Sequence, residues 1–342
     1  MSGPIKTGFI FGAGASLSAG YPLAKDIPPA IKEFIARLDQ RHDCGVLRTW
    51  CDETLVLMEQ EHYATLDELA FVLRERDGGR AILRAKAVMT ALFFDLERQA
   101  DLTAYRRAVR AMIDFADHLA LPADGTMRVP SAAFCMTYNY DRCLEAAIYH
   151  EVRATGRSPE TGYFGNVEVG VQRLINSGCD TMKERYEPID TSRFAVLKMH
   201  GLVGTFWEHE YPSGKALSDF GKVAISDELL LGFERDPPRA SPTMIFFPWE
   251  TKNASEWTRP LIMETGRAAK AFLSNVEELK IVGYSFHDLN RPRFESLIAN
   301  ARKCRVIDLY DPSEESWLRL KSLTTRLGLS AELLRHEDGW NP

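Results

Sequence analysis

The sequence has no pair of cysteines at C-x-x-C spacing, and only six cysteines occur in 342 residues. This spacing excludes both a zinc ribbon and a disulfide framework of the usual kinds. Cys135 and Cys304 lie inside apolar, strand-like runs, where a thiol behaves as a small buried hydrophobe. We therefore expect free thiols and a reducing, cytoplasmic setting.

Long apolar runs and an excess of positive charge are also missing. No stretch is long enough to cross a bilayer, and residues 1–6 do not resemble a secretory signal. The chain carries 42 Lys and Arg against 48 Asp and Glu, a formal net charge of −6, which argues against a nucleic-acid-binding surface. We expect a globular cytoplasmic protein that binds neither membranes nor nucleic acid directly.

The most informative stretch that is present lies near the start, where residues 9–22 read FIFGAGASLSAGYP. The apolar run predicts a short buried strand, and Gly12, Gly14 and Ser16 follow it in a tight turn. Backbone N–H groups exposed after such a strand suit a phosphate, so the turn indicates a nucleotide pyrophosphate. The usual third glycine is replaced by Leu17. A glycine-rich turn with a purely structural role therefore stays open as the alternative.

Strand and helix patterns alternate through the second half of the chain. Strands are predicted over 132–137, 194–199, 279–282 and, as the last one, 305–309, with helices over 142–154, 257–274, 291–302 and 314–327. This alternation predicts an α/β fold, a Rossmann-like parallel sheet with helices on both faces. Residues 23–129 show helical patterns and no convincing strand. We therefore predict a catalytic domain made of 1–22 and 130–342, with an all-helical insertion over 23–129.

Polar residues follow the predicted strands, where ligands bind to such sheets. Asn139 is a neutral amide that can hold a water or a ribose hydroxyl. Asp141 can accept the N–H of a carboxamide, or it can cap the following helix. His200 can take a proton near neutral pH, and His287 is its rival. We expect Asn139 and His200 to lie in the crevice at the strand ends, not at core positions.

Four motifs appear in order: GAGAS at 12–16, TYNYD at 137–141, KMHG at 198–201 and GYS at 283–285. Together they resemble the sirtuin-like superfamily, in particular its bacterial branch that hydrolyses NAD+ in antiphage defence. The resemblance implies that NAD+ is the substrate, without a metal, and that Asn139 and His200 are catalytic. It implies that Asp141 holds the nicotinamide carboxamide. The nucleotide-binding residues that it implies are Gly12, Ala13, Gly14, Ala15 and Ser16 along the pyrophosphate, and Gly283, Tyr284 and Ser285 beside the adenosine.

Two departures from protein-deacylating sirtuins matter. Leu23 and Ala24 stand where those enzymes have a Phe-Arg pair, and the four-cysteine zinc module has no counterpart. We therefore predict an NAD+ glycohydrolase that releases nicotinamide and ADP-ribose. The alternatives are a module that senses NAD+ or ADP-ribose without turnover, an NAD-dependent deacylase or ADP-ribosyltransferase, and a flavodoxin-like or nucleoside-binding protein.

A free NAD+ hydrolase would poison its own cell, so we expect its activity to be gated. The helical insertion is the candidate surface for self-association into a homo-oligomer. It is equally a candidate for docking a defence partner such as an ATPase or an Argonaute-type protein, or for a plain lid over the nicotinamide end.

Overall fold

The structure, a computed structural model, is described for most of the chain. The described residues are 7–60, 62–63, 65–76, 80–117, 134–154, 168–169, 195–203, 205–208, 211–214, 220–222, 244–245, 247, 259–286, 288–338 and 340.

A seven-stranded sheet forms the centre of the molecule, and all of its strand pairs are parallel. Its order is β11-β10-β9-β1-β2-β4-β3. Without the two-residue β3, this is the 3-2-1-4-5-6 order of dinucleotide-binding folds, and the order reverses between β1 and β9. The predicted Rossmann-like fold class is confirmed. The strands are β1 (Thr7–Phe11), β2 (Phe134–Thr137), β3 (Glu168–Val169), β4 (Ala195–Lys198), β9 (Glu278–Val282), β10 (Val306–Tyr310) and β11 (Glu332–His336).

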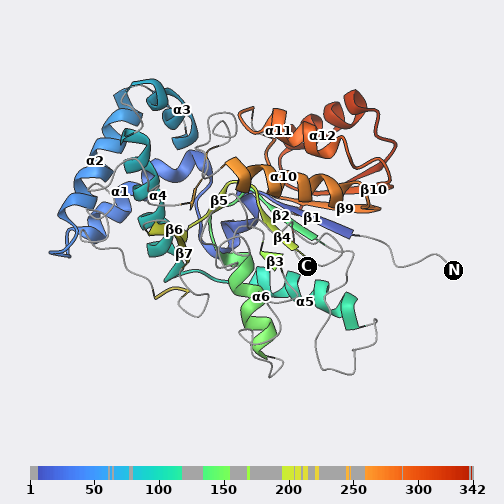
Figure 1. Ribbon diagram of the computed structural model, residues 1–342, viewed down its shortest axis with the longest axis horizontal. Helices are drawn as coiled ribbons and strands as arrows, with labels where there is room; N and C mark the ends of the chain where they lie inside the picture. The colour runs from blue at the N-terminus through green and yellow to red at the C-terminus, as the bar shows by residue number, and fades with distance from the viewer. Residues whose placement is uncertain are drawn as a thin grey trace.

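Alternate residues of the central strands face two separate cores, as the two-residue period of a strand requires. Ile10 joins the core under α10 (Arg259–Leu273), α11 (Arg291–Ile298) and α12 (Glu314–Leu327). Phe11 joins the other core, together with residues of α5 (Thr103–Asp117) and α6 (Cys143–Ala154). Figure 1 shows α10, α11 and α12 on one side of the sheet and α5 and α6 on the other. Helices therefore cover both faces.

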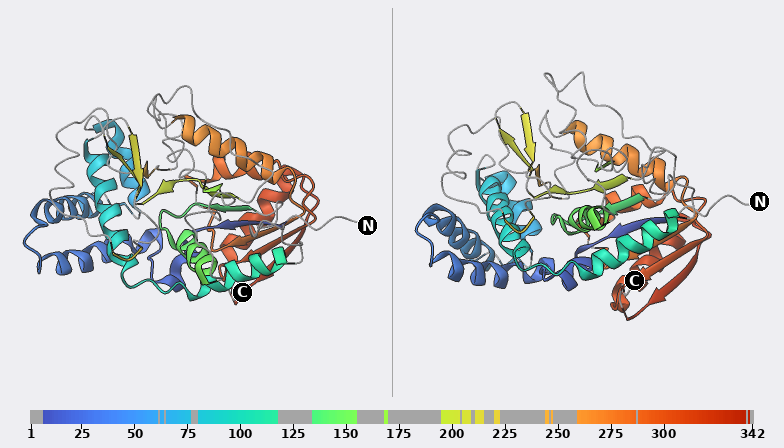
Figure 2. Two further views of the ribbon diagram at one scale, coloured as in Figure 1. Left: turned by 60° about the horizontal axis from the view of Figure 1, so that its bottom comes forward. Right: turned by 90° about the horizontal axis from the view of Figure 1, so that it is seen from below.

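The described residues between β1 and β2 form helices and no strand. α1 to α4 stand together at one end of the sheet, and α5 runs back beside α6 (Figure 2). Residues 65–68 read TLDE, the sequence pattern of a capping box, and the structure forms it: Thr65 and Glu68 exchange side chain-to-backbone hydrogen bonds at 3.2 and 3.3 Å. The proposed domain boundaries stay a prediction. The first four helices are α1 (Ile27–Leu38), α2 (Gly45–Gln60), α3 (Leu66–Arg76) and α4 (Arg80–Glu97).

The prediction that the strand over 305–309 is the last one is wrong, because β11 adds a further strand at the sheet edge. Its sequence, ELLRH, has no buried residue, so it lacks the apolar alternation that marks a strand. Two short antiparallel pairs lie outside the sheet: β5 (Gly201–Leu202) with β8 (Met244–Ile245), and β6 (Thr205–Glu208) with β7 (Tyr211–Gly214).

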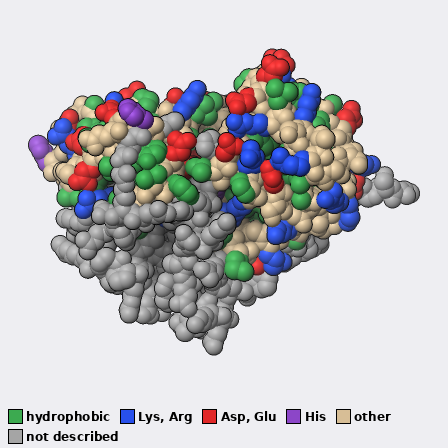
Figure 3. Space-filling view, turned by 90° about the horizontal axis from the view of Figure 1, so that it is seen from above, with side chains coloured by type: hydrophobic (Ala, Val, Ile, Leu, Met, Phe, Trp, Pro, Cys, Tyr) green, Lys and Arg blue, Asp and Glu red, His purple; other side chains and the backbone are tan. Residues whose placement is uncertain are grey.

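The described surface is mixed in charge. Lys and Arg side chains alternate with Asp and Glu on the face drawn in Figure 3. Within the described residues, no helix combines the length and apolar character needed to span a membrane.

Candidate functional site

The turn after β1 is locked against the turn after β9. Gly12 N donates to Val282 O and Gly14 N to Gly283 O, both at 2.9 Å. A Cβ on Gly14 would lie 2.8 Å from Gly283 Cα, and one on Gly283, whose φ is +57°, would lie 2.4 Å from Ala15 N. The glycines therefore first of all allow two backbones to touch. The sequence predicts that the missing side chain of Gly14 leaves room for a pyrophosphate. In the structure, the backbone of Gly283 fills the place where a Gly14 side chain would lie.

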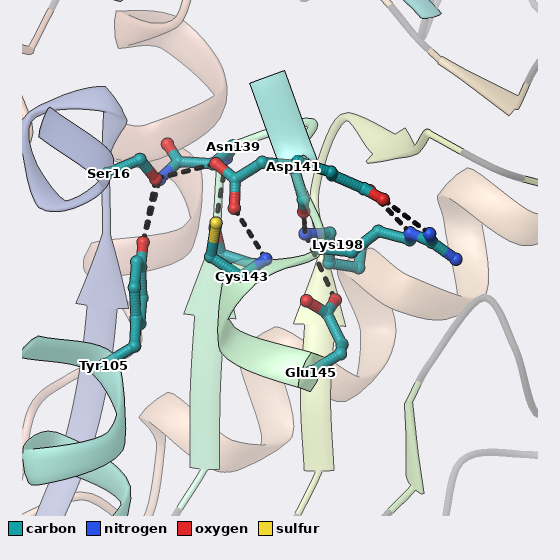
Figure 4. A network of polar contacts seen from close by, with 10 residues as sticks. Ser16, Tyr105, Asn139, Asp141, Cys143, Glu145 and Lys198 are labelled. Carbon is teal, nitrogen blue, oxygen red and sulfur yellow. Dashed lines mark hydrogen bonds and ion pairs between the residues drawn. The ribbon is translucent and has the colours of Figure 1, made fainter. Parts of the chain in front are cut away.

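Residues Ala13–Ala19 form a short 3-10 helix, η1, after this turn. Ala13 is exposed, whereas Ser16 is buried and its hydroxyl points inward. Ser16 Oγ donates to Asp141 Oδ2 at 2.7 Å and lies 2.9 Å from the hydroxyl of Tyr105 (Figure 4). Because the Ser16 hydroxyl is engaged in these bonds, only the backbone of Ser16 can contact a phosphate.

Asn139 lies directly behind Ser16, and its amide group has a fixed orientation. Nδ2 donates to Gly12 O at 2.8 Å and to Ser16 Oγ at 2.9 Å. Since a backbone carbonyl only accepts, the nitrogen must face Gly12 and the oxygen must face the other way. The side chain is 6% exposed, so Asn139 is buried while it lines a cavity at the strand ends. The motif therefore supplies a buried and oriented amide.

Asp141 caps the following helix, as the alternative interpretation predicts. Oδ1 accepts from Cys143 N at 2.9 Å, and Cys143 is the first residue of α6. The loop is also held from β4, because Lys198 Nζ donates to Asp141 O at 2.6 Å and pairs with Glu145 at 3.1 Å. The Asp141 carboxylate is also hydrogen-bonded to the side chain of Cys143. The implied contact with a carboxamide stays a prediction.

His200 follows β4 and is 2% exposed, so it too is buried. Its pKa is lowered to about 3, because burial and the positive charge of Arg293 both disfavour the imidazolium. The backbone of Tyr138 and the side chain of Asn290 act in the opposite direction and offset this only in part. The rival His287 lies outside the described residues. His200 is thus a neutral imidazole at pH 7.

Buried polar atoms without a hydrogen-bond partner gather around one cavity of about 140 Å³. Asn139 Oδ1 and His200 Nε2 are two of them. Such atoms are costly unless a ligand or water satisfies them. The cavity therefore suits a polar ligand that can contact both. The other unpartnered atoms on its wall are Tyr138 OH, Tyr284 OH and Asn290 Oδ1.

A larger cavity of about 740 Å³ lies over the ends of β1, β9 and β10, where the strand order reverses. Ala13 and Ser285 line both this cavity and the smaller one, so the two adjoin at the locked turn. Gly14, Ala15 and Gly283 line only the larger one, and Gly12, Ser16 and Tyr284 only the smaller one. The predicted site residues are thus brought together, but on two sides of the turn.

Several residues of this site lie outside the sequence motifs. Tyr105 comes from α5, Asn290 precedes α11, and Trp340 closes the larger cavity while stacking on Phe11 at 5.0 Å. Tyr105 lies inside a helix, and Trp340 follows β11, a strand that the sequence does not predict, so only the folded chain brings them to the site. Among the described residues, no group of three or more His, Cys, Asp or Glu is arranged to hold a metal ion.

Comparisons with known proteins return only distant structural likeness. No protein-family model matches the sequence, and no curated protein matches it. Among solved structures, Sir2Tm bound to a propionylated peptide is 12% identical with a TM-score of 0.38, over 97% of this chain and 86% of that one. A mutant Sir2 with a deacetylated p53 peptide and 3′-O-acetyl ADP-ribose is 13% identical with a TM-score of 0.39, over 97% and 87% of the two chains.

Proposed function

We propose that this protein is an NAD+ glycohydrolase that releases nicotinamide and ADP-ribose. One observation carries the proposal. Asn139 Oδ1 and His200 Nε2 are buried, unpartnered and on the wall of one cavity, which adjoins a larger cavity at the point where the strand order reverses. A dinucleotide has two unequal ends, and its larger, ADP-ribose end matches the larger cavity.

The small cavity has the Asp141 carboxylate on its wall, which favours the nicotinamide end, and the positive charge of Arg293 acts beside His200. Arg142 and Lys198 are each paired with a glutamate, Glu97 and Glu145, in buried ion pairs. Asp141 is hydrogen-bonded through its carboxylate to Ser16 and to the backbone of Cys143. Its negative charge therefore favours the cationic pyridinium of NAD+ and the positive charge that develops on the ribose during cleavage.

The proposed reaction breaks the bond between ribose C1′ and the nicotinamide ring nitrogen. The bonding electron pair leaves on that nitrogen, which turns the cationic ring into neutral nicotinamide. A water oxygen bonds to C1′ and releases one proton to solvent. Asn139 Oδ1 accepts a hydrogen bond from this water or from a ribose hydroxyl, and His200 Nε2 accepts a second one. Because the pKa of His200 is lowered to about 3, this orienting role is favoured over a role as general base.

The test is nicotinamide release from NAD+ by the wild type and by Asn139→Ala and His200→Ala. We expect turnover to fall by roughly a hundredfold or more in both variants, with NAD+ still bound through the larger cavity. Asn139→Ala also removes one of the two hydrogen bonds that Gly12 O accepts and one of the two that Ser16 Oγ accepts, so it should lower the free energy of unfolding by about 1–3 kcal/mol. His150→Ala, an exposed change on α6, is the control.

Two outcomes contradict the proposal. Wild-type protein that binds NAD+ without releasing nicotinamide, with any activating partner present, identifies a sensing module instead. An active His200→Ala protein beside an inactive but folded His287→Ala protein transfers the histidine role to His287.

We further propose that the activity is gated and serves antiphage defence, with a homo-oligomer or a partner such as an ATPase or an Argonaute-type protein as the trigger. The support is the sequence resemblance and the harm that uncontrolled NAD+ loss does to a cell. The neighbouring genes, together with turnover measured with and without their products, test this role.

A further inference from the structure

Tyr105 lies against the candidate catalytic loop although it belongs to α5, in the helical segment. Its hydroxyl is 2.9 Å from Ser16 Oγ and 3.5 Å from Asn139 Nδ2. The side chain is 4% exposed, and its ring packs on Phe11 at 6.0 Å between centroids. Figure 4 shows the phenol reaching Ser16 from below, with Asp141 beside Ser16 to the right.

The hydrogen bonds around Ser16 can be assigned a direction. Ser16 has one hydroxyl proton, and the carboxylate Oδ2 of Asp141 at 2.7 Å can only accept it. The amide Nδ2 of Asn139 can only donate, and it donates to one lone pair of Ser16 Oγ. Tyr105 must then donate its own proton to the other lone pair. Burial and the negative charge of Asp141 raise the pKa of Tyr105, which keeps the phenol protonated.

We infer that Tyr105 is a positioning residue for Asn139. Tyr105 donates to the last free lone pair of Ser16 Oγ. The serine hydroxyl therefore keeps its own proton in the hydrogen bond to Asp141, and Ser16 Oγ accepts a hydrogen bond from the Asn139 amide. This bond adds to the one from Asn139 Nδ2 to Gly12 O, and together they keep the amide oxygen on the cavity side. This inference rests on the proposed function, and it makes α5 a part of the reaction machinery.

The kinetic test is Tyr105→Phe, which removes the hydroxyl and keeps the ring on Phe11. We expect the kcat for nicotinamide release to fall about tenfold, with KM changed less than twofold. In a Ser16→Ala background the same change should have no further effect, because its route through Ser16 is already lost. Tyr149→Phe, a buried tyrosine on α6 that lines neither cavity, is the matched control and should keep wild-type kinetics.

A second readout does not depend on turnover. In protein labelled with an NMR-active isotope on asparagine, the side-chain amide signal of Asn139 is the one lost in Asn139→Ala. It should shift in Tyr105→Phe and in Ser16→Ala but not in Tyr149→Phe. If the wild type releases no nicotinamide even with its activating partner present, the proposed function fails, while this signal still tests the hydrogen-bond chain. Wild-type kcat in Tyr105→Phe, or an unmoved Asn139 signal, overturns the inference.

Discussion

At the scale of single residues, the side chains of the site are buried and fixed by hydrogen bonds and ring contacts. Asn139 is fixed through Gly12 and Ser16, and Asp141 through Ser16 and Cys143. His200 is enclosed by aromatic rings, with Tyr138 at 5.1 Å and Tyr140 at 5.7 Å between ring centroids. Fixed groups lose little entropy when a substrate arrives, so this arrangement favours orientation over proton exchange.

The pKa of His200 gives a prediction for stability against pH. Its value of about 3 in the folded protein lies below the ordinary 6.5. Between these values the unfolded chain holds the proton and the folded chain does not. The free energy of unfolding should therefore fall as the pH drops from about 6.5 towards 3, by at most ~1.4 kcal/mol per pH unit from this group.

Urea unfolding of the wild type and His200→Gln, measured across this pH range, checks the prediction. Glutamine does not titrate, so the stability difference between the two proteins should change steadily as the pH falls. A constant difference from pH 7 to pH 4 would mean that the imidazole titrates normally in the folded protein.

At the scale of elements, three contacts join the helical segment to the site. Tyr140 OH donates to Asp67 Oδ1 at 3.3 Å, Arg142 binds both carboxylate oxygens of Glu97, and Tyr105 reaches Ser16. The Arg142–Glu97 pair is almost fully buried, and removing one partner of such a pair is strongly destabilising. The helices between β1 and β2 are thus coupled to the loop that carries Asn139.

The locked turn between β1 and β9 gives a prediction with an internal control. Gly283→Ala combines a left-handed backbone with a Cβ only 2.4 Å from Gly14 C, so it should lower the free energy of unfolding by about 2–5 kcal/mol. Gly328→Ala has a similar φ of +61° and nothing within 4 Å. It should cost about 1–2 kcal/mol. Urea unfolding measures both, and equal losses would show that packing at the turn contributes nothing.

Sequence patterns identify these elements unequally. Apolar runs such as residues 9–11 and the capping box at Thr65 predict their elements correctly, because each depends on local chemistry. β11 escapes prediction because an edge strand has no buried side to produce alternation. The glycine motif is found, but its use in backbone contact is not, because Gly14 meets Gly283 across 269 residues of chain (283 minus 14). The role of Tyr105 is hidden for the same reason.

At the scale of the whole molecule, the proposed gating predicts a link between assembly and turnover. Light-scattering mass and nicotinamide release should be measured on the same samples over a dilution series. We expect specific activity to rise with the fraction of oligomer or on addition of a partner. A strict monomer with full turnover at every dilution would exclude gating by association.

The place of β1 also bears on how the chain is made. This strand leaves the ribosome before β2 and β9, yet it lies between them in the sheet. Thr7 Oγ1 donates to Glu278 Oε2 across 271 residues. At roughly 5–20 residues per second, synthesis of that span takes on the order of ten to fifty seconds. For that time Phe9 and Phe11 lack one neighbouring strand, so the nascent chain depends on chaperones or on early docking of α1 to α5 to keep β1 from aggregating.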